Sequence, residues 1–300
     1  MTIADRWLLP DGMEEVLPPQ ARQIEGLRRE LLDLFHCWGY DLVFPPPAEY
    51  LESLMTGSGN DLDLQTFKIT DQLTGRLMGV AADITPQVAR MDAHSMQRQG
   101  PARFCYCANV LRTKSSNMLG SRSPMQVGAE LFGHAGVESD SEILGLMIAA
   151  LGTAGAEKIY LDLGHVGIYR ALISEAGLEV DQEKQLFNAI LQKAYADIDQ
   201  IVARDVAHEA VRGMISRLAR LNGGFEVLAL AQVELADAPA SVKEALDSVE
   251  QTAKLIQRQY PNVEINFDLS ELRGYNYHTG MVFAAYIPGY GHPVAQGGRY

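Results

Sequence analysis

Seven polar side chains stand in apolar segments of the sequence that we expect to form strands, and these residue types could do chemistry. They are Asp83, Thr85, Arg112, Gln126, Glu130, Arg273 and Tyr277. Burying a charged group on a sheet costs free energy unless the group is paired or contacts a ligand. The set therefore predicts either structural ion pairs or a binding site for a small polar molecule.

A single amino acid would satisfy the whole set. Asp83 with Gln126 could hold an ammonium group, and Arg273 or Arg112 could bind a carboxylate through charge-assisted hydrogen bonds. Glu130 and a tyrosine could form hydrogen bonds with both nitrogens of an imidazole ring. Together these groups describe a pocket for histidine.

Structural roles remain open alternatives for some of these residues. Arg273 could form an ion pair with Glu271 or Asp268, which lie in the same stretch of the chain. Tyr275 and Tyr277 could simply pack against other apolar side chains. On the residues alone, structural ion pairs and a histidine pocket both explain the pattern.

Helices and strands must position these side chains. Apolar residues recur at helical spacing over 19–38, and Gly39 suits the end of that helix. Segments 103–113 and 123–134 have a period near two and predict an antiparallel hairpin that carries Gln126 and Glu130 on one face. The other expected elements are two strands around the turn Asp71–Gly75, helices at 86–96, 140–152 and 241–258, and strands at 158–163 and 263–270. For the helix at 140–152, Ser139 and Glu142 predict a capping box.

The order of these elements indicates an α+β fold, with a mixed, mainly antiparallel sheet flanked by helices. Segment 165–225 is helical in pattern, and we interpret it as an insertion into a core formed by 1–164 and 226–300. No G-x-G-x-x-G motif follows a strand, and no G-x-x-x-x-G-K-[ST] motif occurs. Their absence argues against a doubly wound nucleotide-binding fold.

Composition limits the possible partners. The formal net charge is -13 over 300 residues, whereas nucleic-acid binders usually carry a basic surface. No apolar run approaches the roughly 20 residues that cross a bilayer, and the N-terminal segment has no apolar stretch typical of a secretory signal. We therefore expect a soluble, cytoplasmic protein that binds neither nucleic acid nor membranes.

Metal and cofactor chemistry is not expected. Cys105 and Cys107 lie in an apolar alternating segment, without a nearby pair of further ligands, so we interpret them as core thiols. His278 has no ligand pair beside it and is interpreted as a polar residue lining a site. The sequence predicts no catalytic residue, no cofactor and no metal ligand.

Five segments resemble histidyl-tRNA synthetases, which are class II aminoacyl-tRNA synthetases, in the same order along the chain. GYDLVFPPPAEY is similar to motif 1, with Pro46 as its characteristic proline, and NVLRTKSSNMLGSRSPMQVGAELFG is similar to motif 2. TFKITDQLTGRLMGVAADIT resembles the hairpin before the amino-acid site, ELRGYNYHTGMVF the histidine-specific motif, and GGRY the start of a glycine-rich strand. The resemblance covers the chain except for the helical segment, and it implies a class II synthetase-like core.

The departures from that family deplete the positions that serve ATP. Lys114 stands where motif 2 has a glutamate, and only Arg122 remains of two loop arginines, because the stretch reads Leu119, Gly120, Ser121, Arg122. Val80, Ala81 and Ala82 replace a Leu-Arg-Pro sequence, and His278 replaces a tyrosine. No segment resembles motif 3 or an anticodon-binding domain, and the end at GGRY suggests a chain cut short. By resemblance the seven site residues are the positions that bind the amino acid, with Asp83 in place of a glutamate.

This combination resembles the regulatory subunits of ATP phosphoribosyltransferase. The resemblance implies a non-catalytic subunit that activates the short-form catalytic subunit in histidine biosynthesis and mediates feedback inhibition by L-histidine. It also implies a homodimer within a hetero-octamer. The alternatives are a genuine histidine–tRNA ligase, which histidine-dependent exchange of pyrophosphate into ATP would reveal, and a free-standing histidine-binding module.

Overall fold

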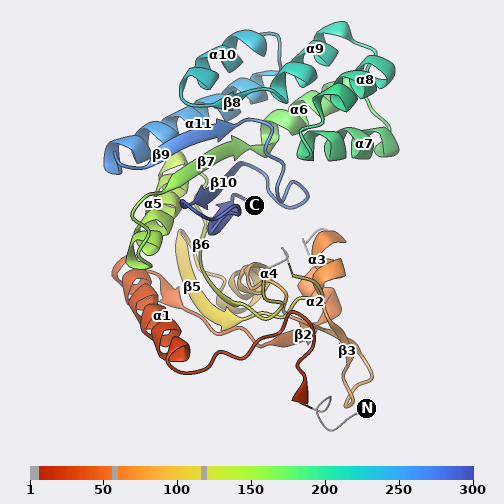
Figure 1. Cartoon of the computed structure of the whole chain (residues 1–300). Coiled ribbons are helices and arrows are strands. Elements are labelled where there is room, and N and C mark those ends of the chain that lie inside the picture. The colour runs from red at the N-terminus through yellow and green to blue at the C-terminus, as the bar shows by residue number, and fades with distance from the viewer. Residues whose placement is uncertain (1–6, 56–59, 116–119) are drawn as a thin grey trace. The chain divides into compact units, whose positions relative to one another are not determined.

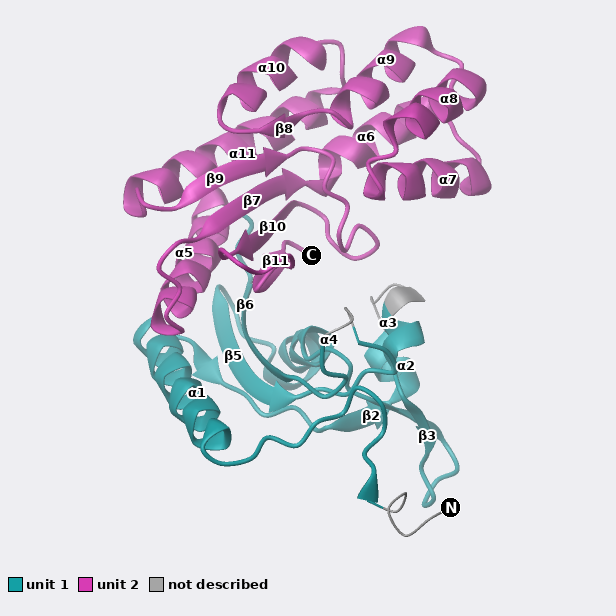
Figure 2. Cartoon of the chain, viewed as in Figure 1, with its two compact units in different colours: residues 1–135 teal, residues 136–300 magenta. Residues whose placement is uncertain are grey.

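The computed structural model describes residues 7–55, 60–115 and 120–300, with side chains from residue 62 onward in the second range. Its contacts divide the chain into two compact units, residues 1–135 and residues 136–300 (Figure 2). Each unit has its own buried apolar cluster, so each is described by itself.

The first unit contains the predicted hairpin. Strands β5 (Ala102–Asn109) and β6 (Met125–Phe132) pair antiparallel, and β1 (Asp41–Leu42) pairs parallel to β5, which gives the order β1-β5-β6 (Figure 1). Helix α1 (Gln20–Cys37) packs on β5 and buries Leu31 and Phe35. The predictions of this helix and of the hairpin are confirmed. Cys105 and Cys107 are buried in β5, as the prediction of core thiols required.

A second small sheet of this unit has the order β2-β4-β3 and contains the other predicted hairpin. Its strands are β2 (Ala48–Tyr50), β3 (Lys68–Thr70) and β4 (Leu77–Val80), all antiparallel. The turn between β3 and β4 is held by Asp71, whose carboxylate accepts hydrogen bonds from the backbone N–H of Leu73 and the hydroxyl of Thr74. Helices α2 (Leu51–Met55) and α3 (Asn60–Gln65) connect β2 to β3.

The predicted helix at 86–96 is present with a change of type along its length. It starts as α4 (Thr85–Arg90) and continues as a π-helix over Met91–Met96. Helix α4 is tied to β2, because Glu49 of β2 forms a bidentate ion pair with Arg90 and accepts a hydrogen bond from Gln87. This contact holds α4, which begins at the site residue Thr85 and follows the site residue Asp83.

The second unit is built on one five-stranded sheet with the order β11-β10-β7-β9-β8. The strands are β7 (Tyr160–His165), β8 (Asn222–Gly223), β9 (Glu264–Asp268), β10 (Met281–Tyr286) and β11 (Ala295–Gly298). Only β7 and β9 pair parallel to each other. One face of this sheet contributes Leu161, Leu163 and Phe267 to the core cluster, and the alternate positions Asp162 and Asn266 lie on the opposite face.

The helices of this unit are α5 (Val137–Thr153), α6 (Val166–Ala176), α7 (Val180–Leu191), α8 (Tyr195–Asp205), α9 (Glu209–Leu218), α10 (Glu226–Glu234) and α11 (Ala240–Gln259). Helices α6, α10 and α11 contact strands of the sheet. The helical pattern expected after residue 165 is confirmed by α6 to α9, whose buried residues belong to the same core cluster as the sheet. The boundaries predicted for an insertion at 165–225 within a core of 1–164 and 226–300 stay a prediction.

One local prediction was wrong. Helix α5 begins earlier than expected, with Gly136 as its N-cap in an extended conformation and no side-chain capping bond. Ser139 and Glu142 therefore lie inside the helix instead of forming a capping box at its start. Among the described residues, no helix combines the length and the apolar character that a membrane crossing requires.

Candidate functional site

The hairpin β5–β6 and the start of α4 bring four predicted site residues together in the first unit. Gln126 donates from Nε2 to Oδ1 of Asp83 at 2.8 Å and accepts from the backbone N–H of Ile84 at 3.3 Å. Thr85 donates from Oγ1 to Oε1 of Glu130 at 2.9 Å. Because Gln126 and Glu130 share one face of β6, both reach the same short segment.

A tyrosine that the sequence reasoning did not name completes this cluster. Tyr106 of β5 is 3 % exposed, and its hydroxyl donates to Oε1 of Glu130 at 3.1 Å and lies 3.3 Å from Oγ1 of Thr85. Burial, followed by the charges of Glu130 and Asp83, raises the pKa of Tyr106 well above its ordinary value. The phenol therefore stays protonated and remains a donor at neutral pH. We call Asp83, Thr85, Tyr106, Gln126 and Glu130 the β-hairpin cluster.

A glycine makes room for this tyrosine. Gly128 is the cross-strand partner of Tyr106, and a Cβ atom at Gly128 would clash with the Tyr106 hydroxyl. No side chain larger than hydrogen fits that position without moving the ring. The pairing of an aromatic residue with a glycine across the predicted hairpin was the signal available in the sequence, but it depends on the register.

Arg112 follows β5 and approaches the β-hairpin cluster through the backbone. Its Nε donates to the carbonyl of Ala82 at 3.1 Å, one residue before Asp83. Its own carbonyl accepts from Nε of Arg122 at 3.1 Å, and Arg122 also donates to the carbonyl of Asp11. The loop arginine kept from the family pattern therefore bonds to backbone carbonyls of this unit.

The expectation that all seven site residues lie on strands was wrong for five of them. Only Gln126 and Glu130 lie on a strand. Asp83 accepts from the backbone N–H of Thr85 at 3.2 Å, a turn that starts α4, and Arg112 follows the end of β5. Arg273 and Tyr277 lie in turns before β10. Short apolar segments around polar residues resemble strands even where local side-chain hydrogen bonds favour a turn.

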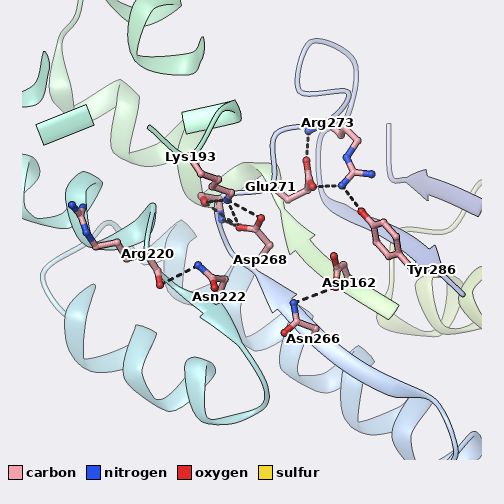
Figure 3. A network of polar contacts seen from close by, with 10 residues as sticks. Asp162, Lys193, Arg220, Asn222, Asn266, Asp268, Glu271, Arg273 and Tyr286 are labelled. Atoms are coloured by element: carbon pink, nitrogen blue, oxygen red, sulfur yellow. Dashed lines mark hydrogen bonds and ion pairs between the residues drawn. The ribbon is translucent and has the colours of Figure 1, made fainter. Parts of the chain in front are cut away.

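Arg273 belongs to a separate polar network in the second unit (Figure 3). Its guanidinium donates to Oε2 of Glu271 at 2.6 Å and to the hydroxyl of Tyr286 at 2.9 Å, and its backbone N–H donates to Oε1 of Glu271 at 2.7 Å. Burial acts to lower the pKa of Arg273, but the hydrogen bonds to Glu271 and Tyr286 more than offset it and raise that pKa. The ion pair with Glu271 is thus confirmed, whereas Asp268 bonds to Lys193 instead.

The neighbouring aromatic residues have different surroundings. Tyr275 packs edge-on against Tyr169, with ring centroids 5.3 Å apart, and also against Phe187, so packing is confirmed for Tyr275. Tyr277 is 44 % exposed, and its ring centroid lies 4.2 Å from that of His278. Arg170 donates to the carbonyls of Tyr275 and His278 and so holds the backbone of this turn.

Two of the positions at which the sequence departs from the synthetase pattern have clear environments. Ala81 and Ala82 are 4 % and 3 % exposed, so small side chains pack where the family has a larger arginine and proline. Lys114 is exposed beyond the end of β5. Leu119 lies outside the described residues. Within the described ranges, no group of three His, Cys, Asp or Glu side chains is placed to hold a metal ion.

Comparison with known proteins identifies relatives over the full length of the chain. The family model described as Histidyl-tRNA synthetase matches residues 12–300. An ATP phosphoribosyltransferase regulatory subunit from Chromohalobacter salexigens is 59% identical over 300 residues, which are 100% of this chain and 76% of the relative. Another, from Alkalilimnicola ehrlichii, is 56% identical over 99% of this chain and 74% of its own length.

Solved structures share the fold. An ATP phosphoribosyltransferase regulatory subunit/histidyl-tRNA synthetase from Bacillus halodurans superimposes with a TM-score of 0.86 at 28% identity, covering 98% of this chain and 76% of the other. A chain of the ATP phosphoribosyl transferase (HisG:HisZ) complex from Thermotoga maritima gives a TM-score of 0.71 at 19% identity, covering 96% of this chain and 93% of the other. The predicted class II synthetase-like α+β fold is confirmed by these similarities.

Proposed function

The chain belongs to the family of ATP phosphoribosyltransferase regulatory subunits, and from this premise we propose that it activates a separate short-form catalytic subunit and mediates feedback inhibition by L-histidine. In this proposal the phosphoribosyl transfer takes place on the catalytic subunit, and the present chain is the regulatory one. The proposed assembly is a homodimer of this chain within a hetero-octamer in the cytoplasm. The Thermotoga maritima complex, named for two kinds of subunit, supports pairing with a catalytic chain.

The observation that carries this proposal is the β-hairpin cluster. Its donors and acceptors match the polar groups of histidine. The Asp83 carboxylate, held by Gln126, suits an ammonium group. The Glu130 carboxylate could accept from the N–H of a neutral imidazole ring, and the Tyr106 hydroxyl could turn its single proton from Glu130 to the unprotonated ring nitrogen. In this proposal Tyr106 is the tyrosine of the histidine pocket.

The carboxylate of histidine requires a cationic partner. Arg112, Arg273 and Tyr277 are proposed as further histidine-binding residues, together with Thr85 of the β-hairpin cluster. Arg112 lies beside the cluster through its bond to Ala82, and a guanidinium binds a carboxylate with two parallel hydrogen bonds. Arg273 is in the second unit, and its role is tested separately.

The residues of the motif 2 loop support regulation over amino-acid activation. Forming an adenylate requires the phosphate charge to be neutralised by arginines and by metal ions held by acidic groups. Lys114 stands in place of the family's glutamate, and the buried Ala81 and Ala82 replace its arginine and proline. Histidine bound here would therefore act as an effector, which changes activity by binding one state of a complex more tightly than another.

One assay tests the proposal directly. The chain is mixed with a short-form phosphoribosyltransferase subunit, and turnover is measured with and without L-histidine. We expect turnover to rise on mixing and to fall when histidine is added. Failure to form a complex or to activate would reject the proposal. Histidine-dependent exchange of pyrophosphate into ATP by this chain alone would indicate a histidine–tRNA ligase instead.

A further inference from the structure

Arg273 already has a carboxylate partner from its own chain. Both carboxylate oxygens of Glu271 accept hydrogen bonds from Arg273, one from its backbone N–H at 2.7 Å and one from its guanidinium at 2.6 Å. The Glu271 side chain is 17 % exposed and that of Arg273 is 42 % exposed. The Glu271 carboxylate thus already binds the Arg273 guanidinium, which is partly open to solvent.

The position of Glu271 is fixed by the sheet beneath it. Its backbone N–H donates to the carbonyl of Asp268 at the end of β9, and the next residue, Leu272, is 1 % exposed in the core. Gly164 of β7 leaves room for the Asp268 carbonyl and the Glu271 side chain to lie this close to the strand. A Cβ atom there would lie 2.6 Å from the Asp268 carbonyl oxygen and 3.0 Å from Cβ of Glu271. The acid is therefore held against Arg273 before any ligand arrives.

The charges around Arg273 make its surroundings negative. Asp162 lies on the same sheet, and its pKa is raised first by burial and then by the nearby charges of Asp268 and Glu271, while Asn266 and Arg273 lower it. Lys193 bonds to Asp268 at 2.7 Å. The network of Figure 3 contains three carboxylates, those of Asp162, Asp268 and Glu271, and three cations, those of Lys193, Arg220 and Arg273. The charge of Arg220 is balanced by Asp199. A multiply charged anion that approached Arg273 would meet a like-charged neighbourhood.

We propose that Glu271 is a specificity-determining residue, whose carboxylate occupies Arg273 and excludes phosphate-bearing ligands from it. A phosphate or pyrophosphate group must displace Glu271 from the guanidinium and leave a half-shielded carboxylate next to a new anion. A ligand with a single carboxylate meets less electrostatic repulsion in this displacement, because it brings one negative charge in place of two or more. The selection deepens the proposed function, since it rests on Arg273 being one of the proposed histidine-binding residues.

The test compares pyrophosphate binding to the whole chain with and without this acid. Glu271→Gln removes the charge, but its amide oxygen still accepts from the backbone N–H of Arg273. We expect its calorimetric affinity for inorganic pyrophosphate to rise about tenfold, the order of one charge-assisted hydrogen bond at a half-exposed site. Glu264→Gln is the matched control, because it removes the same charge from β9 at a residue that pairs with Lys158. The double variant Glu271→Gln with Arg273→Met should lose the gain.

Each outcome supports or overturns the role of Glu271 in excluding phosphate-bearing ligands. No gain in the Glu271 variant, or an equal gain in the Glu264 control, would overturn the assignment, as would a gain that persists without Arg273. Thermal unfolding of each variant shows whether it is folded. L-histidine is titrated in parallel. If the unmodified chain does not bind histidine but Glu271→Gln gains pyrophosphate affinity, the specificity role of Glu271 stands and the proposed histidine function fails.

Discussion

The β-hairpin cluster of the first unit and the Arg273 network of the second unit satisfy buried or half-buried charge in different ways. The hydrogen bonds described above that reach Asp83 and Glu130 come from an amide, two hydroxyl groups and a backbone N–H. Arg273 is instead neutralised by an acid two residues away in the sequence. These hydrogen bonds come from neutral groups, whereas Arg273 must release its acid partner before it can bind another carboxylate. The two regions should therefore respond differently to the same kind of change.

Acidification should produce the largest difference between the two units, as a loss of stability that originates in the second unit. Burial, followed by the charges of Arg299 and Arg170, lowers the pKa of His165 from its ordinary 6.5 to about 4. The unfolded chain then binds more protons than the folded chain between these values, so stability is complete above pH 6.5 and falls as the pH drops toward 4. The loss assigned to this residue is about 3 kcal/mol at most.

Urea unfolding at pH 6.5 and pH 4 measures this loss. His165 is the N-cap of α6 and accepts from the backbone N–H of Gly167, and asparagine is a strong N-cap residue. His165→Asn should therefore keep the cap and reduce the acid dependence of stability. An unchanged dependence in this variant would contradict the role of His165.

Removing the central acid of the β-hairpin cluster should have the next largest effect. Glu130→Ala takes away the acceptor for Thr85 and Tyr106 and leaves their hydroxyls buried without it. We expect histidine affinity to fall roughly 30-fold, the order expected when a hydrogen bond to a charged group is lost. Calorimetric titration measures the change, with Glu130→Gln as the variant that keeps an acceptor oxygen. An unaltered affinity would remove Glu130 from the pocket.

Displacing Tyr106 without removing a polar group should have a smaller effect on binding. Gly128→Ala places a methyl group against the Tyr106 ring, and overpacking of this kind costs about 1–3 kcal/mol of stability. We expect histidine affinity to fall roughly tenfold, because the phenol is moved from Glu130. Gly26→Ala on α1 is the control, since nothing lies within 4 Å of its added Cβ. Equal behaviour of the two variants would show that the position of Tyr106 is not needed.

The smallest effect is expected from the ion pair between Lys193 and Asp268. Lys193→Met leaves Asp268 with its hydrogen bonds from Ser270 and should lower the free energy of unfolding by about 1 kcal/mol. Histidine affinity should be unchanged, because Lys193 and Asp268 are not among the proposed histidine-binding residues. Lys254→Met, at an exposed pair with Glu250, is the matched control. A large fall in histidine affinity would show that the Lys193–Asp268 pair contributes to histidine binding.

Much of the fold was predictable because its information is local. The apolar period of 19–38 and the alternation of 103–113 and 123–134 were enough to predict α1 and the β5–β6 hairpin. Helix starts were harder, because Gly136 caps α5 through its backbone conformation, whereas Ser139 and Glu142 resembled a capping motif. The residues of the site were found through their types and through family resemblance. Their placement in turns was not predicted, because the bond from Thr85 to Asp83 competes with strand formation.

The sequence by itself determined which side chains were available for chemistry, and it placed Glu271 within reach of Arg273. It also fixed the replacements at Ala81 and Lys114 that argue against adenylate formation. Only the tertiary structure decided that Tyr106 donates a hydrogen bond to Glu130 and packs against Gly128. It also decided that Asp268 bonds to Lys193 and not to Arg273. The physical reason is distance along the chain. Neighbouring residues meet whatever the fold, whereas the register of a hairpin and contacts between distant segments depend on how the whole core packs.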